Sequence, residues 1–149
     1  LRTDEDVEAV QEGLVDGTID AIVTDHAAHA EEEKDREFRY APSGFPGLET
    51  AVGVLLTDLY HAGKITLPLL IEKMTASPAK VFKLKKGTLS KEAPADVTVI
   101  DTEAEWIVEK EKFYTMGTHS PFIGRKLKGK PIMTIVDGRI IMQNGIIID

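Results

Sequence analysis

The sequence predicts an α/β protein in which a helix-and-strand region is followed by an antiparallel β region. Three observations support this fold class. A capped helix pattern leads into a short apolar run that ends at Asp25, further helical patterns follow, and after Gly87 the hydrophobic period changes to that of strands. A helix followed by a strand is the half-repeat of a parallel barrel or of a doubly wound sheet.

The first helix is predicted to begin after Thr3. The Thr3 hydroxyl can accept a backbone N–H three residues on, and the acidic first turn suits the positive end of the helix dipole. Val7, Val10 and Leu14 share one face of this helix, and Asp16-Gly17 supplies a left-handed stop.

A buried strand is predicted at residues 19–23, which are rich in β-branched side chains and too few for a helix. Asp25 and His29 follow it. In parallel α/β architectures, ligands and catalytic groups lie at the carboxyl ends of the strands. Asp25 is therefore the candidate for chemistry. The alternative interpretation is a helix N-cap beside a solvated histidine.

Residues 26–47 form a long connection, and loops of this length are usually functional or disordered. Its acidic part, residues 31–37, is predicted to be a solvated helix or loop surface. Residues 41–47 contain two prolines and two glycines, which can bring main-chain groups close to a ligand. The alternative for this part is a rigid turn before a helix.

Three helices are predicted next. The first runs from Leu48 to about Ala62 and ends at Gly63, the second is capped by Thr66, and the third covers residues 79–82 with Ser77-Pro78 as its cap. His61 and His119 have no partner at ligand spacing, so both are interpreted as structural or solvent-facing.

Strands are predicted from the β-branched runs of the carboxyl-terminal part, at residues 96–101, 105–108, 131–136, 139–143 and 146–148. Asp137-Gly138 and Asn144-Gly145 are typical two-residue hairpin turns. We expect a domain boundary near residues 84–95 and place it at residue 87.

Composition narrows the possible functions. The 149 residues carry a net charge of −7, with 13 acidic and 3 basic side chains in residues 1–37. Phosphate-backbone binding needs a basic face, so nucleic acid is not expected as a partner. There is no cysteine, no apolar run approaches the roughly 18 residues of a membrane span, and no signal peptide is recognisable. The chain begins with Leu1, and we expect it to be a piece of something longer.

Several motifs resemble, in order, the last third of bacterial dihydroorotases, which are cyclic amidohydrolases. These are Thr24-Asp25-His26-Ala27-Ala28-His29, Gly44-Phe45-Pro46-Gly47-Leu48-Glu49-Thr50, Ser77-Pro78-Ala79-Lys80, residues 95–101, Ser120-Pro121-Phe122-Ile123-Gly124 and residues 134–138. The histidine four residues after the aspartate favours dihydroorotase over hydantoinase or allantoinase relatives. The chain differs from that family at Ser43, Ala28 and Glu92, where phenylalanine, proline and glycine are usual.

The resemblance implies the last part of a (β/α)8 barrel, residues 1–86 with residues 19–24 as strand 8, and part of a small β-sandwich, residues 87–149. It implies that Asp25 is a metal ligand that also acts as general base and then protonates the departing ring nitrogen. It implies that His29 holds the substrate carboxylate and that Ser43 and Gly44 contact the substrate through main-chain groups.

The resemblance also implies a cofactor, one or two zinc ions. A catalytic zinc takes about three protein ligands, so the remaining ligands are expected outside this chain. A whole barrel needs about 250 residues. We therefore expect the 149 residues alone to be inactive and to need the upstream part of the barrel as a partner.

The function implied is the zinc-dependent, reversible hydrolysis of dihydroorotate to carbamoyl aspartate in cytoplasmic pyrimidine biosynthesis, in a homo-oligomer, and the resemblance allows aspartate transcarbamoylase as a further partner. Two alternatives stay open. One is another cyclic amidohydrolase, of the hydantoinase or allantoinase type. The other is a non-catalytic, dihydroorotase-like subunit that supports aspartate transcarbamoylase.

Overall fold

A computed structural model describes residues 3–148 and divides the chain into two compact units. Unit 1 comprises residues 1–23, 58–101 and 131–149, and unit 2 comprises residues 24–57 and 102–130. The predicted boundary at residue 87 falls inside unit 1. The assignment of residues 1–86 to a barrel and 87–149 to a sandwich stays a prediction.

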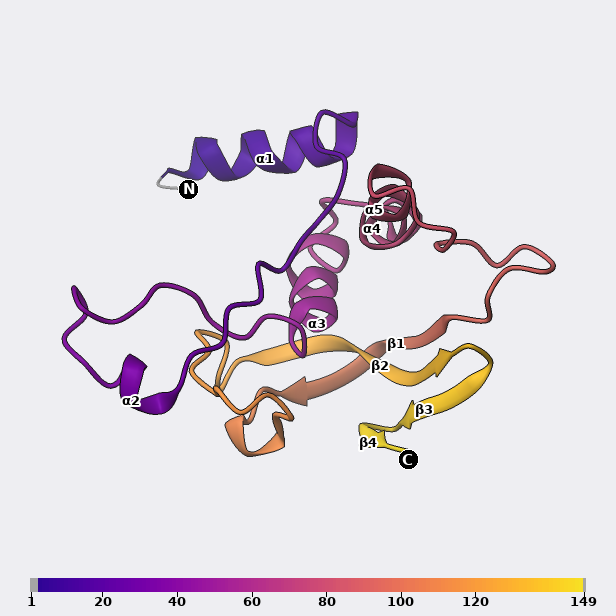
Figure 1. Ribbon diagram of the computed structural model, residues 1–149. Coiled ribbons are helices and arrows are strands. Elements are labelled where there is room, and N and C mark those ends of the chain that lie inside the picture. Colours follow the sequence, from indigo (N-terminus) through magenta and orange to yellow (C-terminus); the bar gives the residue numbers. More distant parts are fainter. Residues whose placement is uncertain (1–2, 149) are drawn as a thin grey trace. The chain divides into compact units, whose positions relative to one another are not determined.

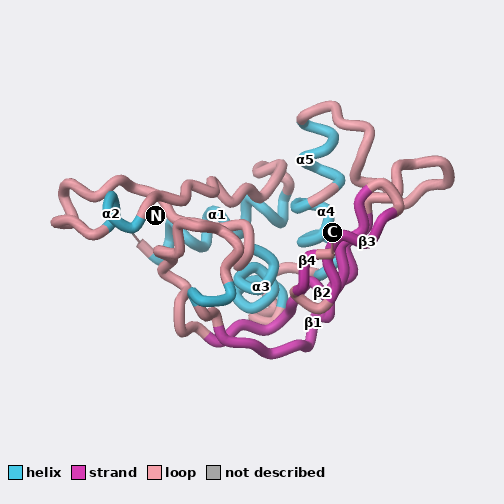
Figure 2. Tube along the Cα trace, turned by 60° about the horizontal axis from the view of Figure 1, so that its bottom comes forward, coloured by secondary structure: helices cyan, strands magenta, loops and turns pink. Residues whose placement is uncertain are grey.

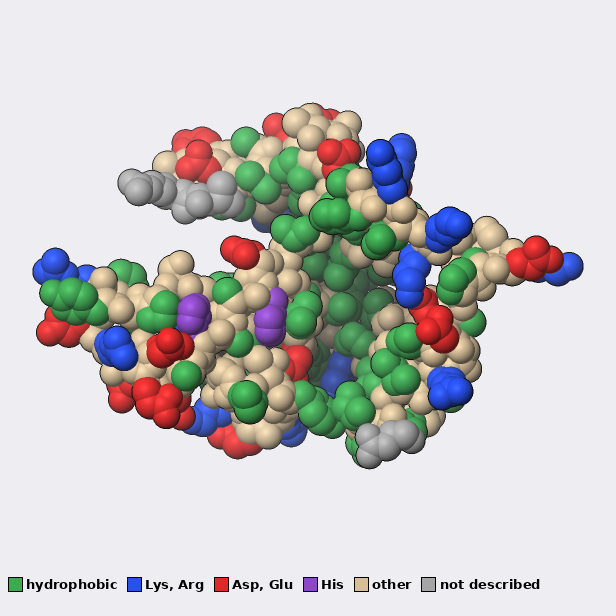
Figure 3. Space-filling model, viewed as in Figure 1, with side chains coloured by type: hydrophobic (Ala, Val, Ile, Leu, Met, Phe, Trp, Pro, Cys, Tyr) green, Lys and Arg blue, Asp and Glu red, His purple; other side chains and the backbone are tan. Residues whose placement is uncertain are grey.

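Unit 1 begins with α1 (Asp4–Asp16), which confirms the first predicted helix. Thr3 and Asp6 form a capping box, and Gly17 ends the helix with a φ of 89°. Leu14 is buried, whereas Figure 3 shows Asp and Glu side chains on the surface of this helix. The cap and the glycine stop could be predicted from the sequence because both depend only on interactions between residues close together in the chain.

Residues 19–23 are not a β-strand, and the prediction of one was wrong. Their backbone bonds to the last turn of α4 (Leu67–Met74) instead: Ile22 N–H donates to the carbonyl of Lys73 at 3.0 Å, and the buried Lys73 ammonium donates to the carbonyl of Ile19. A strand needs a neighbouring strand for its ladder. No strand among the described residues pairs with this segment, so it stays irregular.

The two helices that follow in unit 1 are α4 and α5 (Ala76–Val81), which contact each other (Figure 1). Thr66 caps α4 through the N–H of Leu69 at 3.4 Å, as predicted, and Leu70 is fully buried. The predicted Ser77 cap of α5 was wrong. The N-cap is Thr75, because Ser77 and Pro78 already have helical conformation in the first turn.

The strands form one sheet in the order β1-β2-β3-β4. β3 pairs antiparallel with β2 and with β4, and Figure 2 draws the four strands in magenta. Their bounds are β1 (Val97–Ile107), β2 (Lys126–Val136), β3 (Arg139–Gln143) and β4 (Ile146–Ile147). The two hairpin turns are confirmed, with positive φ at Asp137, Gly138, Asn144 and Gly145. The strands predicted at residues 96–101 and 105–108 are one continuous strand, β1. The strand predicted at residues 131–136 begins five residues earlier, as β2.

The helix predicted from Leu48 begins in unit 2 as α3 (Ala51–Leu55) and continues as the π-helix η1 (Leu56–Tyr60), whose last three residues belong to unit 1. Gly53 lies close to two residues of the sheet, since a Cβ there would be 2.8 Å from Trp106 and 3.1 Å from Leu127. Thr57 accepts the N–H of Lys128 at 2.8 Å. These contacts hold α3 against the parts of β1 and β2 that belong to unit 2.

Unit 2 also contains α2 (Glu31–Lys34) and the 3₁₀ turn η2 (Lys110–Lys112). The acidic residues of α2 are exposed, which confirms the solvated surface predicted for residues 31–37. Across residues 3–148, no helix has the length and apolar character needed to cross a membrane.

Candidate active site

Asp25 lies in unit 2, at the start of the loop that carries the predicted site residues. Its φ is 46°, in the left-handed region that few residues other than glycine adopt, although aspartate tolerates it better than most. Its side chain is exposed, and within residues 3–148 its carboxylate makes no hydrogen bond or ion pair. The carboxylate is thus available to a ligand or to a reacting group.

The loop at residues 24–29 lies against the loop at residues 43–48. Ala27 N–H donates to the carbonyl of Phe45 at 3.1 Å. His26 Nδ1 accepts the N–H groups of Gly47 at 3.2 Å and Leu48 at 3.4 Å. Because Nδ1 accepts, the ring proton of neutral His26 is on Nε2. His26 was not singled out from the sequence, but here it aligns the two loops.

Two glycines allow these loops to approach each other. Gly44 has a φ of 112°, and a Cβ there would be 2.7 Å from Ala27 Cβ. A Cβ on Gly47 would be 3.2 Å from both Thr24 Cβ and the carbonyl oxygen of Thr24. A side chain at Gly44 would therefore push the loops apart and would also require a strained backbone.

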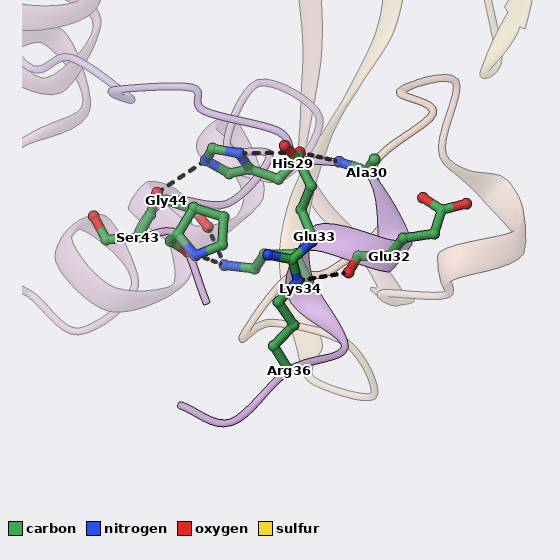
Figure 4. A network of polar contacts seen from close by, with 9 residues as sticks. His29, Ala30, Glu32, Glu33, Lys34, Arg36, Ser43 and Gly44 are labelled. Atoms are coloured by element: carbon green, nitrogen blue, oxygen red, sulfur yellow. Dashed lines mark hydrogen bonds and ion pairs between the residues drawn. The ribbon is translucent and has the colours of Figure 1, made fainter. Parts of the chain in front are cut away.

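His29 binds the second loop through one ring nitrogen (Figure 4). Its Nε2 lies 3.0 Å from the carbonyl oxygen of Ser43, and since a carbonyl only accepts, Nε2 carries a proton. Nδ1 lies 3.7 Å from Glu33 Oε2, in an exposed pair of the kind that contributes little to stability. Nδ1 is the other ring nitrogen, and it could donate to an anionic ligand only from the doubly protonated ring, in competition with Glu33.

Lys34 fixes the backbone at residues 42–44, at the start of the loop that faces residues 24–29. Its ammonium donates to the carbonyls of Pro42 at 2.9 Å and Gly44 at 2.8 Å (Figure 4). These carbonyls flank Ser43, so the main-chain groups around the predicted substrate contact are held in place. The sequence indicated only a charged surface here. The sequence feature that could have indicated the role of Lys34 is the nearby proline- and glycine-rich loop, because the backbone carbonyls of such a loop need hydrogen-bond donors.

The described residues fit one part of a metal site. Within residues 3–148, no three His, Asp or Glu side chains gather closely enough to hold a metal ion. Asp25 fits a single ligand position, because its carboxylate is exposed and unengaged within that part of the chain and carboxylate oxygens bind zinc. A catalytic zinc needs about two further protein ligands.

The structure thus brings three of the four predicted site residues together: His29, Ser43 and Gly44. Asp25 is at the other end of the same short loop, with no direct contact to them among the contacts described. Sequence reasoning missed His26 and Lys34, whose partners are 8 to 22 residues away along the chain.

Comparison with known proteins identifies the family. The profile described as "Amidohydrolase family" matches residues 1–141. The chain belongs to the amidohydrolase family. This agrees with the resemblance to cyclic amidohydrolases predicted from the sequence motifs.

Proteins with the name dihydroorotase are similar to this amidohydrolase chain over almost all its length. The one from Pelotomaculum thermopropionicum is 52% identical over 99% of the chain and 34% of its own length. The one from Endomicrobium trichonymphae is 49% identical over 96% of the chain and 34% of its own length. The chain therefore spans about a third of the length of these relatives.

Solved structures share the fold. The L-hydantoinase from Arthrobacter aurescens superposes with a TM-score of 0.91 at 31% identity, covering 99% of this chain and 34% of that one. The dihydropyrimidinase from Brevibacillus agri has the same TM-score at 23% identity, over 99% of this chain and 33% of that one, and shows the fold alone. An α/β amidohydrolase fold with an antiparallel sheet is thus established.

Proposed function

We propose that this chain forms part of a dihydroorotase, which interconverts dihydroorotate and carbamoyl aspartate in pyrimidine biosynthesis. The main support for the proposal is sequence identity: about half of the residues, over nearly the whole chain, are identical to those of proteins with the name dihydroorotase. The resemblance of residues 24–29 and 44–50 to dihydroorotase motifs also supports it, since these segments carry the predicted site residues Asp25, His29 and Gly44.

In this proposal Asp25 is one ligand of a zinc site, and the other ligands come from outside this chain. Zinc, as one ion or two, would supply Lewis acidity and lower the pKa of a bound water. Asp25 would take the proton from the attacking water and deliver it to the ring nitrogen as the amide C–N bond breaks. The reaction thus needs no second proton carrier from this chain.

His29, Ser43 and Gly44 would bind the substrate. Dihydroorotate carries a carboxylate, and His29 would bind it as the imidazolium, donating from Nδ1 while Nε2 donates to Ser43. The backbone around Ser43 and Gly44 is held by Lys34, so its main-chain groups would be preorganised for hydrogen bonds to the ring. Replacement of the usual phenylalanine by Ser43 leaves such main-chain contacts possible.

The remaining parts of the proposal concern the whole protein. We propose that the upstream barrel is the immediate partner, that the enzyme is a homo-oligomer and that it acts in the cytoplasm, where this pathway operates. A complex with aspartate transcarbamoylase belongs to the same proposal. Gel filtration of the complete protein, with and without that partner, tests both associations.

A second candidate is a hydantoin-opening enzyme, which the likeness to the L-hydantoinase structure favours. We expect the complete, metal-loaded protein to hydrolyse dihydroorotate and to form it from carbamoyl aspartate, with little turnover of hydantoin or allantoin. Faster turnover of hydantoin than of dihydroorotate would contradict the proposal. Turnover of none of these rings, together with tight binding to aspartate transcarbamoylase, would support a non-catalytic subunit.

A further inference from the structure

Glu49 binds a segment that is distant in the sequence. Its Oε2 accepts the N–H of Tyr114 at 2.9 Å, and its Oε1 accepts the N–H of Thr115 at 3.0 Å and the Thr115 hydroxyl at 2.7 Å. One carboxylate thus receives three hydrogen bonds from two consecutive residues. Hydrogen bonds to a charged acceptor are stronger than those between neutral groups, so this contact fixes the loop at residues 114–117.

The same loop touches the backbone of His29. A Cβ on Gly117 would overlap the carbonyl oxygen of His29 and would lie 3.0 Å from its amide nitrogen and 3.2 Å from Ala28 Cβ. Residue 117 therefore lies in close contact with the peptide groups on both sides of His29. Movement of this loop would remove the support on that side of the histidine.

Glu49 also adjoins the residues that hold the other end of the loop. The preceding residues, Gly47 and Leu48, donate their N–H groups to His26. The turn at residues 47–49 therefore holds the loop of residues 26–29 at two points. It contacts His26 directly, and it contacts His29 indirectly, through the loop that contains Gly117. All of these residues belong to unit 2.

We propose that Glu49 is a positioning residue for His29, acting through the loop at residues 114–117. Glu49 itself touches no reacting atom in the proposed mechanism. The inference rests on the proposed function, in which His29 binds the substrate carboxylate. Loss of the Glu49 contacts would therefore weaken binding of the anionic substrate and leave the proton transfer by Asp25 largely intact.

The test is Glu49→Gln in the complete protein. The amide keeps one acceptor for Thr115, but its NH₂ group faces the N–H of Tyr114 and cannot accept from it. We expect KM for dihydroorotate to rise about tenfold, equivalent to about 1.4 kcal/mol of binding, and kcat to stay within about threefold. Amide exchange at Tyr114 and Thr115 should accelerate.

Glu111→Gln is the matched control, because Glu111 is exposed in the same unit and has no hydrogen bond or ion pair within the described residues. It should change neither KM nor exchange. An unchanged KM in Glu49→Gln despite faster exchange at Tyr114 and Thr115 would overturn the proposal. Equal effects of the two variants would do the same.

Thr115→Val keeps the test valid if Glu49→Gln does not fold, since it removes only the hydroxyl bond. It should raise KM in the same direction by a smaller factor, with little further effect in the double variant. NMR of the His29 ring separates this inference from the proposed function. The His29 resonances should shift in either variant even if the protein hydrolyses no cyclic substrate, and unchanged resonances would refute the positioning role.

Discussion

At His29, one ring nitrogen is already engaged before any substrate binds. Nε2 donates to the carbonyl of Ser43, which leaves Nδ1 beside Glu33. The histidine therefore has two separable tasks in the proposed enzyme, anchoring the loop and binding the substrate carboxylate. Substitutions that keep one task and remove the other can distinguish them.

His29→Ala in the complete protein should raise KM for dihydroorotate at least about tenfold, since both tasks are lost. His29→Gln keeps an N–H donor that can reach Ser43 but cannot become cationic. We expect it to retain more loop order than His29→Ala and still to raise KM. Steady-state kinetics of both variants provide the measurement, and a wild-type KM in His29→Ala would exclude the substrate-binding role.

The sequence predicted Asp25, His29, Ser43 and Gly44 because they lie in two short segments, residues 24–29 and 41–47, in which the family resemblance assigns them roles. It could not predict Lys34 or Glu49. Their importance comes from carbonyl and amide groups 8 to 66 positions away, and such pairings exist only once the loops have folded. A charged residue in an acidic or apolar stretch gives no local sign of that role.

Among the elements, the helix ends and hairpin turns were the most predictable features. Caps such as Thr3 and turns such as Asp137-Gly138 depend on neighbouring residues only. The strand predicted at residues 19–23 failed because strand formation depends on a partner. The start of β2 was missed because it contains no β-branched residues. Its lysines alternate with Leu127 and Gly129, which are buried against α3 and η1.

Asp96 provides a pH test of the sheet. It precedes β1 and accepts hydrogen bonds from the Lys86 ammonium and from the N–H of Asp137 in the β2–β3 turn, at 2.9 Å for the latter. The Lys86 contact first, and the Asp137 N–H next, lower the pKa of Asp96. A lowered pKa means that folding gains stability above the unfolded-state pKa and loses it as pH falls through the folded-state value.

We therefore expect the wild-type protein to lose stability more steeply than Asp96→Asn as pH falls below about 4, the ordinary range for an aspartate. Denaturant unfolding at a series of pH values measures the difference. Glu92→Gln is a control, since Glu92 is exposed and has no hydrogen bond or ion pair within residues 3–148. Parallel pH curves for wild type and Asp96→Asn would show that the Asp96 contacts do not stabilise the fold.

For the whole molecule, the notable feature is how much hydrophobic surface is exposed. Phe38 and Met116 are almost fully exposed, at 98% and 99%, and Leu89 is exposed at 81%. In unit 1, an open, mainly apolar cavity of about 560 Å³ is lined by residues of α4, of α5, of the segment that follows α5 and of the start of β1. Exposed apolar patches usually mark interaction surfaces, which agrees with a chain that spans a third of its relatives.

The 149 residues alone should therefore show no dihydroorotate turnover, even with added zinc, because Asp25 is one ligand where about three are needed. Adding the upstream portion as a separate chain should restore activity and reduce binding of a hydrophobic dye. Zinc-dependent turnover by the 149 residues without that portion would show that the proposed division of the metal site is wrong.

Dihydroorotate hydrolysis by the complete protein tests the role of Asp25 directly, with the wild type and the Asp25→Asn variant measured side by side. An amide is a poorer metal ligand and carries no proton between water and the leaving nitrogen, so we expect kcat to fall at least about 10³-fold, with the fold retained. A kcat for Asp25→Asn close to that of the wild type would contradict the assignment of Asp25 and, with it, the proposed mechanism.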